Sequence, residues 1–573
     1  MSFSSKLSTF RPLSETGSCL SLLKIAGIAA LLFFLIGYIL FPILKTLEVS
    51  LLKDQTFSVS TYLLLFTNES YRVPVVNSIV LGGLTVLVCG VIGTLLAFFI
   101  HFFEFPHKSV VDKLLLLPML LPGIIIVFSF VQLYGESGLI TKTLQFALGL
   151  EEPPLNISGL PGILFIHAYT QYVYFYISVS IALKHIDISV IESARSLGAS
   201  KHRILGTVVF PFLAPALIAA SAMTFMTGIG AFTAPSIVGG SFKVLTTQIL
   251  LAKANNYMDI AATQVVTLIA ISLFLFGVFR FYEGRTRFTS SVNVVPIQPV
   301  RIRSQGVRLL VLLSAGIVIA TILLPVVTII LISFVPSGSW MVSYYPTDFS
   351  LQNYADIFSR SRRLAPFLNS VVMALAAGGL GAIIALPCSY IIVRSQIRIK
   401  WLVEILTVLP WAVPASAIAI NIINAFNEPS LFSFSAVLVG SSVLLPLGYL
   451  IKSLPIMIRT INISLGKLND TYLEVSKSLG ANRLQTFTQI ILPVLSPGLL
   501  AGFLLVFIRS IGEYTMSVFL YNASNKPVSI AMVNGIFEYN IGLAMAYGSL
   551  LIVLTVLLVW VIGRFLGTFL RPE

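Results

Sequence analysis

Long apolar runs separated by short polar segments make up almost the whole chain. A membrane-spanning helix needs about 20 consecutive, mostly apolar residues, and runs of that length recur throughout. They predict six spans in the first half, at 25–47, 75–102, 113–134, 160–183, 213–233 and 260–281. The second half predicts six more, at 308–333, 369–393, 401–424, 434–454, 496–520 and 544–566. We therefore expect an all-α polytopic membrane protein with about twelve transmembrane helices.

The polar segments contain an internal repeat. The phrase SARSLGAS at 193–200 returns as VSKSLGAN at 475–482, an offset of 282 positions. Asn77 begins NSIV and Asn369 begins NSVV, while PMLLPG at Pro118 matches PWAVPA at Pro410, both at an offset of 292. These constant offsets predict a first six-span domain over 1–282, a cytoplasmic linker over 283–307 and a second six-span domain over 308–573. Because each unit has an even number of spans, the two repeats are expected to be parallel.

Composition and charge support the same class. Hydrophobic residues make up 57% of the chain and charged residues 10%, whereas about a quarter of the residues of a soluble domain are charged. The net charge of +14 does not indicate a nucleic-acid partner, because Lys and Arg are divided among short segments between the spans. Placing most of them on the cytoplasmic side puts both chain ends and both repeated phrases there.

Each copy of the repeated phrase is predicted to form a helix–glycine–helix elbow at the membrane surface. Ser189 stands three residues before Glu192, and Thr471 three before Glu474, which is the spacing of a capping box. A glycine follows in each copy, where the left-handed conformation would end the helix. A second short helix is expected over 203–207 and 483–486. Two equivalent elbows on one face suit a two-fold partner; the alternative is a well-capped connecting loop.

Through this repeated phrase, the sequence resembles the permease subunits of binding-protein-dependent ABC importers, the type I importer class. The likeness covers nearly the whole chain, once in each half. The repeated phrase is similar to the EAA loop of that family, which forms the coupling helix that fits a cleft on a separate ATPase. The resemblance assigns to the two coupling loops Glu192, Ala194, Gly198, Ala199, Arg203 and Pro211, and Glu474, Ser476, Gly480, Ala481, Arg483 and Pro493. Ser193 and Val475 depart from the usual alanine after the glutamate.

The resemblance also implies partners. The chain has no G-x-x-x-x-G-K-[ST] phosphate loop, so ATP and magnesium are expected on a partner, and no cofactor or catalytic residue is expected here. Two copies of a cytoplasmic ATPase would bind the elbows. A solute-binding protein outside the bacterial inner membrane would deliver the cargo. An ion-coupled secondary carrier and a channel are the alternative classes.

Charged residues within the predicted spans are candidates for function. Arg509 and Glu513 lie four positions apart in FIRSIGEYT, so one continuous helix would place them on the same face as a neutralised pair. Such a pair is either structural or adjacent to the transport pathway. The corresponding positions of the first half hold Thr227 and Ala231. The other candidates for the pathway or its gate are Phe232, Thr233 and Tyr514.

Two smaller motifs give expectations about helix geometry. The two prolines of PMLLPG and of PWAVPA are expected to kink the third and ninth spans. Asn77-Ser78 and Asn369-Ser370 are expected to stand at helix starts, where their side chains would act as caps.

The solute is inferred from resemblance alone. A single chain that holds both permease halves most resembles the ferric-iron uptake branch, and the stretches GAFTAPSIVGGSFKVLTTQIL and GEYTMSVFLYNASNKPVSIAMVNGIFEYN look closest to it. Permeases for 2-aminoethylphosphonate and thiamine are similar, and a polyamine is a further alternative. Ferric iron is the expected cargo.

Overall fold

A computed structural model describes residues 17–53, 56–285, 304–336 and 345–569, with the single positions 299 and 339. Most of the predicted linker, 286–298 and 300–303, lies outside the described residues. The described chain is nearly all helical. One two-stranded antiparallel sheet, β1 (Leu52–Lys53) and β2 (Thr56–Phe57), connects α2 to α3.

The first repeat begins with one long span and contains six helical spans. Its helices are α1 (Gly17–Leu35), η1 (Ile36–Leu40), α2 (Phe41–Leu51), α3 (Ser60–Thr67), α4 (Glu69–Phe102), α5 (Lys108–Leu114), α6 (Leu117–Leu120), α7 (Gly123–Tyr134), α8 (Leu139–Leu148), α9 (Gly159–Lys184), α10 (Ile188–Ser196), α11 (Lys201–Ile204), η2 (Leu205–Val209), α12 (Phe210–Ile229), α13 (Thr233–Val238), α14 (Leu245–Ala254) and α15 (Met258–Arg285).

The second repeat follows the same order. Its helices are α16 (Gln305–Ser333), α18 (Gln352–Ser359), α19 (Ser361–Arg394), α20 (Lys400–Ala412), α21 (Ala415–Phe426), η3 (Leu431–Ser433), α22 (Leu444–Gly466), α23 (Asp470–Ser478), α24 (Arg483–Thr486), η4 (Phe487–Ile491), α25 (Leu492–Ile511), α26 (Thr515–Leu520), α27 (Val528–Phe537) and α28 (Ile541–Phe569).

The number of spans agrees with the hydrophobic pattern. Among the described residues, 10 helices are long and apolar enough to cross a membrane, or up to 12 if each bent pair counts as one span. The tenth predicted span, 434–454, is wrong at its start, because α22 begins only at Leu444. Phe434, Ser435 and Gly440 take positive φ angles in the loop before it, and a helix cannot continue through such residues.

The proline motifs break the helices rather than kink them. Pro122 and Pro414 are the N-caps of α7 and α21, in extended backbone conformations. The chain turns by 116° between α20 and α21. Proline cannot donate the hydrogen bond that would continue the preceding helix, and it disfavours helical geometry in the residue before it. A new helix therefore starts after each second proline, and in the second repeat it takes a different direction.

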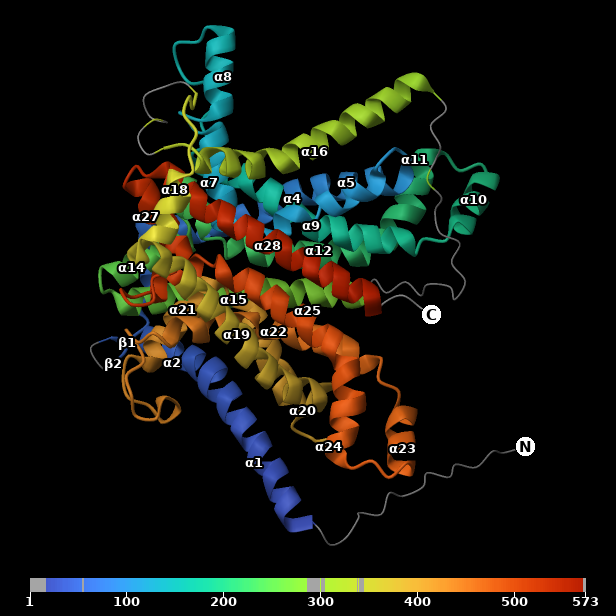
Figure 1. Cartoon of the computed structure of the whole chain (residues 1–573), viewed down its shortest axis with the longest axis vertical. Helices are drawn as coiled ribbons and strands as arrows, with labels where there is room; N and C mark the ends of the chain where they lie inside the picture. The colour runs from blue at the N-terminus through green and yellow to red at the C-terminus, as the bar shows by residue number, and fades with distance from the viewer. Residues whose placement is uncertain are drawn as a thin grey trace.

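The two repeats have the same orientation, and the first span of each packs against the other repeat. α10 and α23 both lie at the right end of Figure 1, and α14 and α27 lie at the left end. α1 and α16 lie on opposite flanks in the same view. α2 packs on α15 of its own repeat and on α21 of the other, and α16 likewise packs on α28 and α7. One hydrophobic core accordingly includes residues of both repeats.

The Asn-Ser motifs were misplaced by the sequence analysis. Ser78 and Ser370 lie well inside α4 and α19, not at helix starts. Each hydroxyl oxygen accepts a hydrogen bond from the first N–H of a different helix: Leu245 of α14 at 2.8 Å and Val528 of α27 at 2.9 Å. The motif therefore caps a distant helix start, identically in the two repeats.

Candidate functional site

The repeated phrases form two elbows of the same design. In the first, α10 ends beside Gly198, and α11 begins after Ser200, which accepts a hydrogen bond from Arg203 N–H. In the second, α23 ends beside Gly480 and α24 follows. Gly198 and Gly480 have φ angles of +79° and +78°. The predicted left-handed glycines are confirmed, since these angles are unfavourable for residues with a Cβ.

Two details of the predicted elbow are wrong. The N-caps are Asp187 and Asn469, whose side chains accept hydrogen bonds from Ser189 and Thr471 N–H, so the capping boxes with Glu192 and Glu474 do not form. Asp and Asn are among the best N-cap residues, and here they occupy the extended position directly before each helix. The second short helices are the first turns of the next spans, which run through Lys201–Val238 and Arg483–Ile511.

Polar and apolar side chains are exposed on both elbows, where a partner could contact them. Glu192, Arg203, Glu474 and Arg483 are exposed, as are Gly198 and Gly480. The leucine before each glycine is the most exposed apolar group of its elbow, with Leu197 88% and Leu479 82% exposed. Ala194, Ala199 and Ala481 are half-buried. Ser476 is buried, and its hydroxyl bonds to that of Thr486 at 2.8 Å across the bend. Small residues therefore face inward and leave the leucines pointing out.

The prolines after the elbows follow π-helical turns. η2 precedes Pro211 and η4 precedes Pro493, and in each case the proline is at the second position of the following α-helix. η1 precedes Pro42 in the same way. A π-turn makes room for the proline ring and for the carbonyl that it leaves unpaired. The proline after each elbow thus has a geometric role at the entry to the fifth span.

The second elbow is anchored to the bundle by an arginine of α19. Arg394, at the end of α19, forms an ion pair with Asp470 and donates hydrogen bonds to the carbonyls of Leu465 and Leu468. The repeat offsets place Phe102 and Ile188 at the positions of Arg394 and Asp470. The ion pair thus ties the second elbow to the bundle, and the two aligned positions of the first repeat are uncharged.

The aromatic gate candidates meet where the repeats touch. Phe232 and Tyr514 are both buried, and their ring centroids lie 5.8 Å apart. Phe519 joins them, with its ring 5.7 Å from that of Phe232. Lys253 of the first repeat donates a hydrogen bond to the Phe519 carbonyl at 2.6 Å. Thr233, the first residue of α13, is half-buried beside this cluster. The repeat-related pair Phe232 and Tyr514 thus lies at the junction of the two halves.

Two glycine–proline contacts flank this aromatic cluster. A Cβ at Gly512 would lie 2.3 Å from Pro122 Cβ, and one at Gly230 would lie 3.1 Å from Pro414 Cβ. Each glycine caps the C-terminus of the fifth span of its repeat, α25 or α12. Each proline belongs to the broken third span of the opposite repeat. The repeats therefore make close contact with each other through matched positions.

Arg509 and Glu513 do not form the predicted ion pair. α25 ends at Ile511, so the two residues do not share one helix face. The Glu513 carboxylate instead accepts hydrogen bonds from Met516 N–H at 2.8 Å and Ser517 N–H at 3.1 Å. Glu513 therefore caps α26, where the helix dipole favours negative charge. Arg509 is exposed and takes part in none of the ion pairs found among the described residues.

Lys452 is a half-buried cation that the sequence analysis missed. It lies in α22 and donates hydrogen bonds to the carbonyls of Val413 at 2.8 Å and Pro410 at 3.2 Å. The break before α21 frees these carbonyls, and a cation at a helix C-terminus stabilises them. The corresponding position in the first repeat is Thr170.

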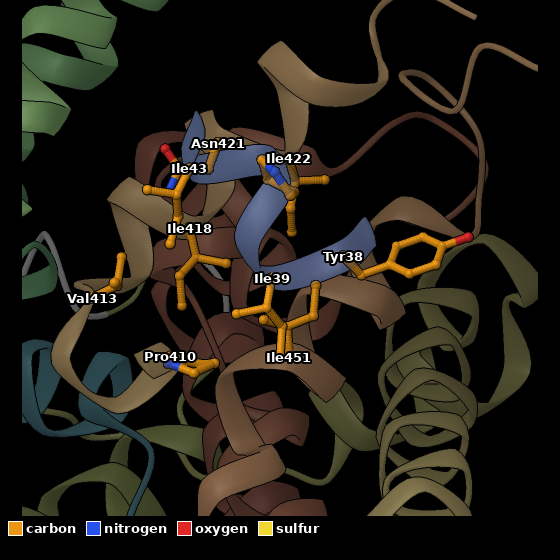
Figure 2. Close-up of a pocket in the computed structure, with 10 residues that line it drawn as sticks. Tyr38, Ile39, Ile43, Pro410, Val413, Ile418, Asn421, Ile422 and Ile451 are labelled. Carbon is orange, nitrogen blue, oxygen red and sulfur yellow. The ribbon is translucent and has the colours of Figure 1, made fainter. Parts of the chain in front are cut away.

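A small pocket lies where η1 meets the broken ninth span. Figure 2 shows Tyr38, Ile39 and Ile43 on one wall and Pro410, Val413, Ile418 and Ile451 around the rest. It encloses about 20 Å³, room for a single water molecule. The buried Asn421 Oδ1 in its wall has no hydrogen-bond partner among the described residues. The mostly apolar lining does not provide the oxygen ligands that a transported ion would need, and the volume excludes any larger solute.

Parallel six-span repeats, paired elbows at one end and broken spans at the junction define a duplicated membrane permease. The sequence matches the binding-protein-dependent transport system inner membrane components over residues 90–288 and 377–573. The chain belongs to this family, the permeases of ABC importers, and its two matches lie one in each repeat. This membership replaces the ion-coupled carrier and the channel as interpretations of the fold.

Relatives extend the likeness to most of the chain. A probable ABC transporter permease of Sinorhizobium fredii is 30% identical over 89% of this chain and 90% of its own length. A ferric transport system permease of Actinobacillus pleuropneumoniae is 26% identical over 94% of this chain and 78% of its own length. The solved structure of a bacterial ABC transporter that imports alginate covers 46% of this chain and 96% of its own, with a TM-score of 0.39 and 17% identity.

Proposed function

We propose that this permease carries ferric iron across the bacterial inner membrane. An extracytoplasmic solute-binding protein would deliver the iron, and two copies of a cytoplasmic ATPase, holding ATP and magnesium, would drive transport. The ferric relatives support this cargo, because the likeness to them includes both repeats within one chain. The multi-pass fold and the family support the inner membrane as the location.

The position of the two elbows supports the ATPase partner. α10 and α23 project from the same end of the bundle (Figure 1), so one two-fold symmetric partner can contact both. Each elbow presents a protruding leucine beside a left-handed glycine, with charged residues around it. A buried apolar anchor within a polar rim is the usual composition of a protein interface.

The charge at the elbow end supports its cytoplasmic placement. Arg195, Lys201 and Arg203 belong to the first elbow, and Lys477 and Arg483 to the second. Such an excess of basic residues is typical of cytoplasmic loops. With both elbows inside, the even number of spans puts the N- and C-termini in the cytoplasm. The opposite end, which holds α14 and α27, would then receive the binding protein.

The test is uptake by the complete complex. The permease is expressed with its ATPase, reconstituted in liposomes with its binding protein, and supplied with ⁵⁵Fe(III). Gly198→Val and Gly480→Val place a β-branched residue at positive φ, which costs about 1–3 kcal/mol of strain. We expect each variant to lose ATPase association and uptake. Gly206→Val is the control, since a side chain there meets open space and the backbone has no positive φ.

The outcomes separate the two parts of the proposal. Wild-type uptake and ATPase binding in both elbow variants would refute the coupling role. ATP-driven uptake of thiamine, 2-aminoethylphosphonate or a polyamine in place of iron would refute the cargo and leave the coupling role intact.

A further inference from the structure

The packing of α22 against α25 fixes where Arg509 points. A Cβ at Gly498 would lie 2.3 Å from Ser464 Oγ, and one at Gly502 would lie 2.4 Å from Thr460 Oγ1. The helices are thus antiparallel, and Gly498, Gly502 and Arg509 lie within about 40° of one another on the helix, at 3.6 residues per turn. Arg509 therefore faces α22, at the level of Lys452.

The first repeat confirms this register. Thr227 and Gln171 occupy the positions of Arg509 and Ser453, at the offset of 282. The Thr227 hydroxyl donates a hydrogen bond to Gln171 Oε1 at 2.7 Å across the same helix pair. In the first repeat the contact between the two helices is therefore made by neutral side chains. In the second repeat the Arg509 guanidinium lies opposite Ser453.

Arg509 is nevertheless exposed. It faces a neighbouring helix within the bundle, yet α22 does not cover it, and it forms no ion pair among the described residues. A guanidinium at membrane depth is costly unless it is paired or lies in a water-filled space. Its five N–H donors are therefore available to a ligand.

The neighbouring charges give this location a positive character. Lys452 keeps one of its three ammonium protons beyond the two carbonyls that it binds. The Glu513 carboxylate lies at the N-terminus of α26, where it accepts hydrogen bonds from Met516 and Ser517. Two cations therefore stand against one carboxylate that is already hydrogen-bonded. None of these three charges has a charged counterpart in the first repeat, where Thr170, Thr227 and Ala231 stand.

We propose that Arg509, with Lys452 beside it, is a binding subsite for an oxyanion on the transport pathway. The inference rests on the proposed function and makes it more specific: the iron crosses as a complex with an oxyanion such as phosphate. Two positive charges repel a bare trivalent cation, whereas they attract the oxyanion oxygens of a complex in which phosphate has neutralised the charge of the iron. A guanidinium fork matches phosphate and carboxylate oxygens in a bidentate geometry.

The experiment uses the reconstituted complex with two labels. Liposomes with the permease, ATPase and binding protein receive ⁵⁵Fe(III) and [³³P]phosphate, and the entry of both is measured with ATP inside. We expect the labels to enter in a fixed ratio. Arg509→Gln should lower the entry of both by about tenfold or more, the scale of one charge-assisted hydrogen bond. Arg509→Lys, which keeps the charge, should recover part of it.

Controls separate the subsite from general damage. Arg459→Gln removes another cation of α22, one that stacks on Trp411 at 5.6 Å, and should leave uptake unchanged. Each variant is compared with wild type in yield, in melting temperature and in basal ATPase rate, so that a misfolded variant is recognised. Arg509→Lys provides the informative case if Arg509→Gln does not fold.

Each outcome supports or overturns the subsite. Entry of ⁵⁵Fe without ³³P, or equal uptake by wild type and Arg509→Gln, overturns it while leaving iron transport in place. Entry of ³³P without iron, sensitive to Arg509→Gln, supports the subsite but shows a free oxyanion as cargo, and the iron proposal then fails.

Discussion

Gly512 of the second repeat lies against Pro122 of the first, so closely that a methyl group on the glycine would stand 2.3 Å from the proline Cβ. This contact joins the end of one fifth span to the broken third span of the other repeat. Gly230 and Pro414 form the corresponding contact on the other side. The halves of the permease therefore touch through a glycine and a proline, each supplied by a different repeat.

Gly512→Ala should destabilise this arrangement, since an added methyl in a packed contact costs about 1–3 kcal/mol. We expect a lower melting temperature in detergent and reduced ATP-driven uptake. Gly379→Ala is the matched control, because a Cβ there meets nothing within 4 Å. Adding Pro122→Gly, which removes the facing Cβ and Cγ, to Gly512→Ala should restore part of the stability. If Gly512→Ala melts like Gly379→Ala, the close contact does not exist in the membrane protein.

Phe432 fills a notch in the first span. Its ring occupies the space beside Gly37, where a Cβ would stand 2.1 Å from the ring, and the Tyr38 hydroxyl donates to its carbonyl at 2.7 Å. Phe432→Ala should lose a fraction of the roughly 3–5 kcal/mol that a fully buried Phe→Ala change costs. Phe434→Ala, at an 80% exposed position, should lose much less. Equal melting temperatures for the two variants would contradict this packing.

Glu513 and Arg509 should behave as independent residues. Glu513→Ala removes a helix cap and should cost about 0.5–2 kcal/mol. Chemical denaturation of the single and double alanine variants gives their coupling energy, which we expect to be below about 0.5 kcal/mol, the limit for independent sites. A coupling of several times that value would restore the ion pair that the sequence suggested.

Arg394→Gln should loosen only the second elbow. The ion pair with Asp470 and the two carbonyl contacts would be lost or weakened. Hydrogen–deuterium exchange should then rise over 470–486 and stay unchanged over 188–204. Arg398→Gln, four residues further on and exposed, is the control. A rise in both elbows, or in neither, would show that this arginine does not anchor the second elbow selectively.

The hydrophobic pattern was sufficient for the span count, the duplication and the glycine bends. These features depend on local properties: apolar length, spacing, and the conformational freedom of Gly198 and Gly480. The pattern failed where a contact from a distant segment decides the structure. Ser78 is inside a helix and caps another one because α14 begins beside it, which the sequence around Ser78 does not reveal.

The missed charge at Lys452 has a specific cause. The predicted span at 434–454 placed this lysine near the membrane surface, where a cation is ordinary. The real helix, Leu444–Gly466, places it well inside, and the positive φ angles before Leu444 explain the difference. Arg509 and Glu513 were misread for a similar reason: four-residue spacing implies one face only while the helix continues, and α25 ends between them.

Joining both repeats in one polypeptide has an evolutionary consequence. In a permease assembled from two identical subunits, any substitution appears on both sides of the symmetry axis. Here a mutation alters one side alone, so Lys452, Arg509 and the Arg394 anchor each occur once, opposite uncharged residues. A fused chain can therefore carry charged residues in one repeat without placing the same charges in the other.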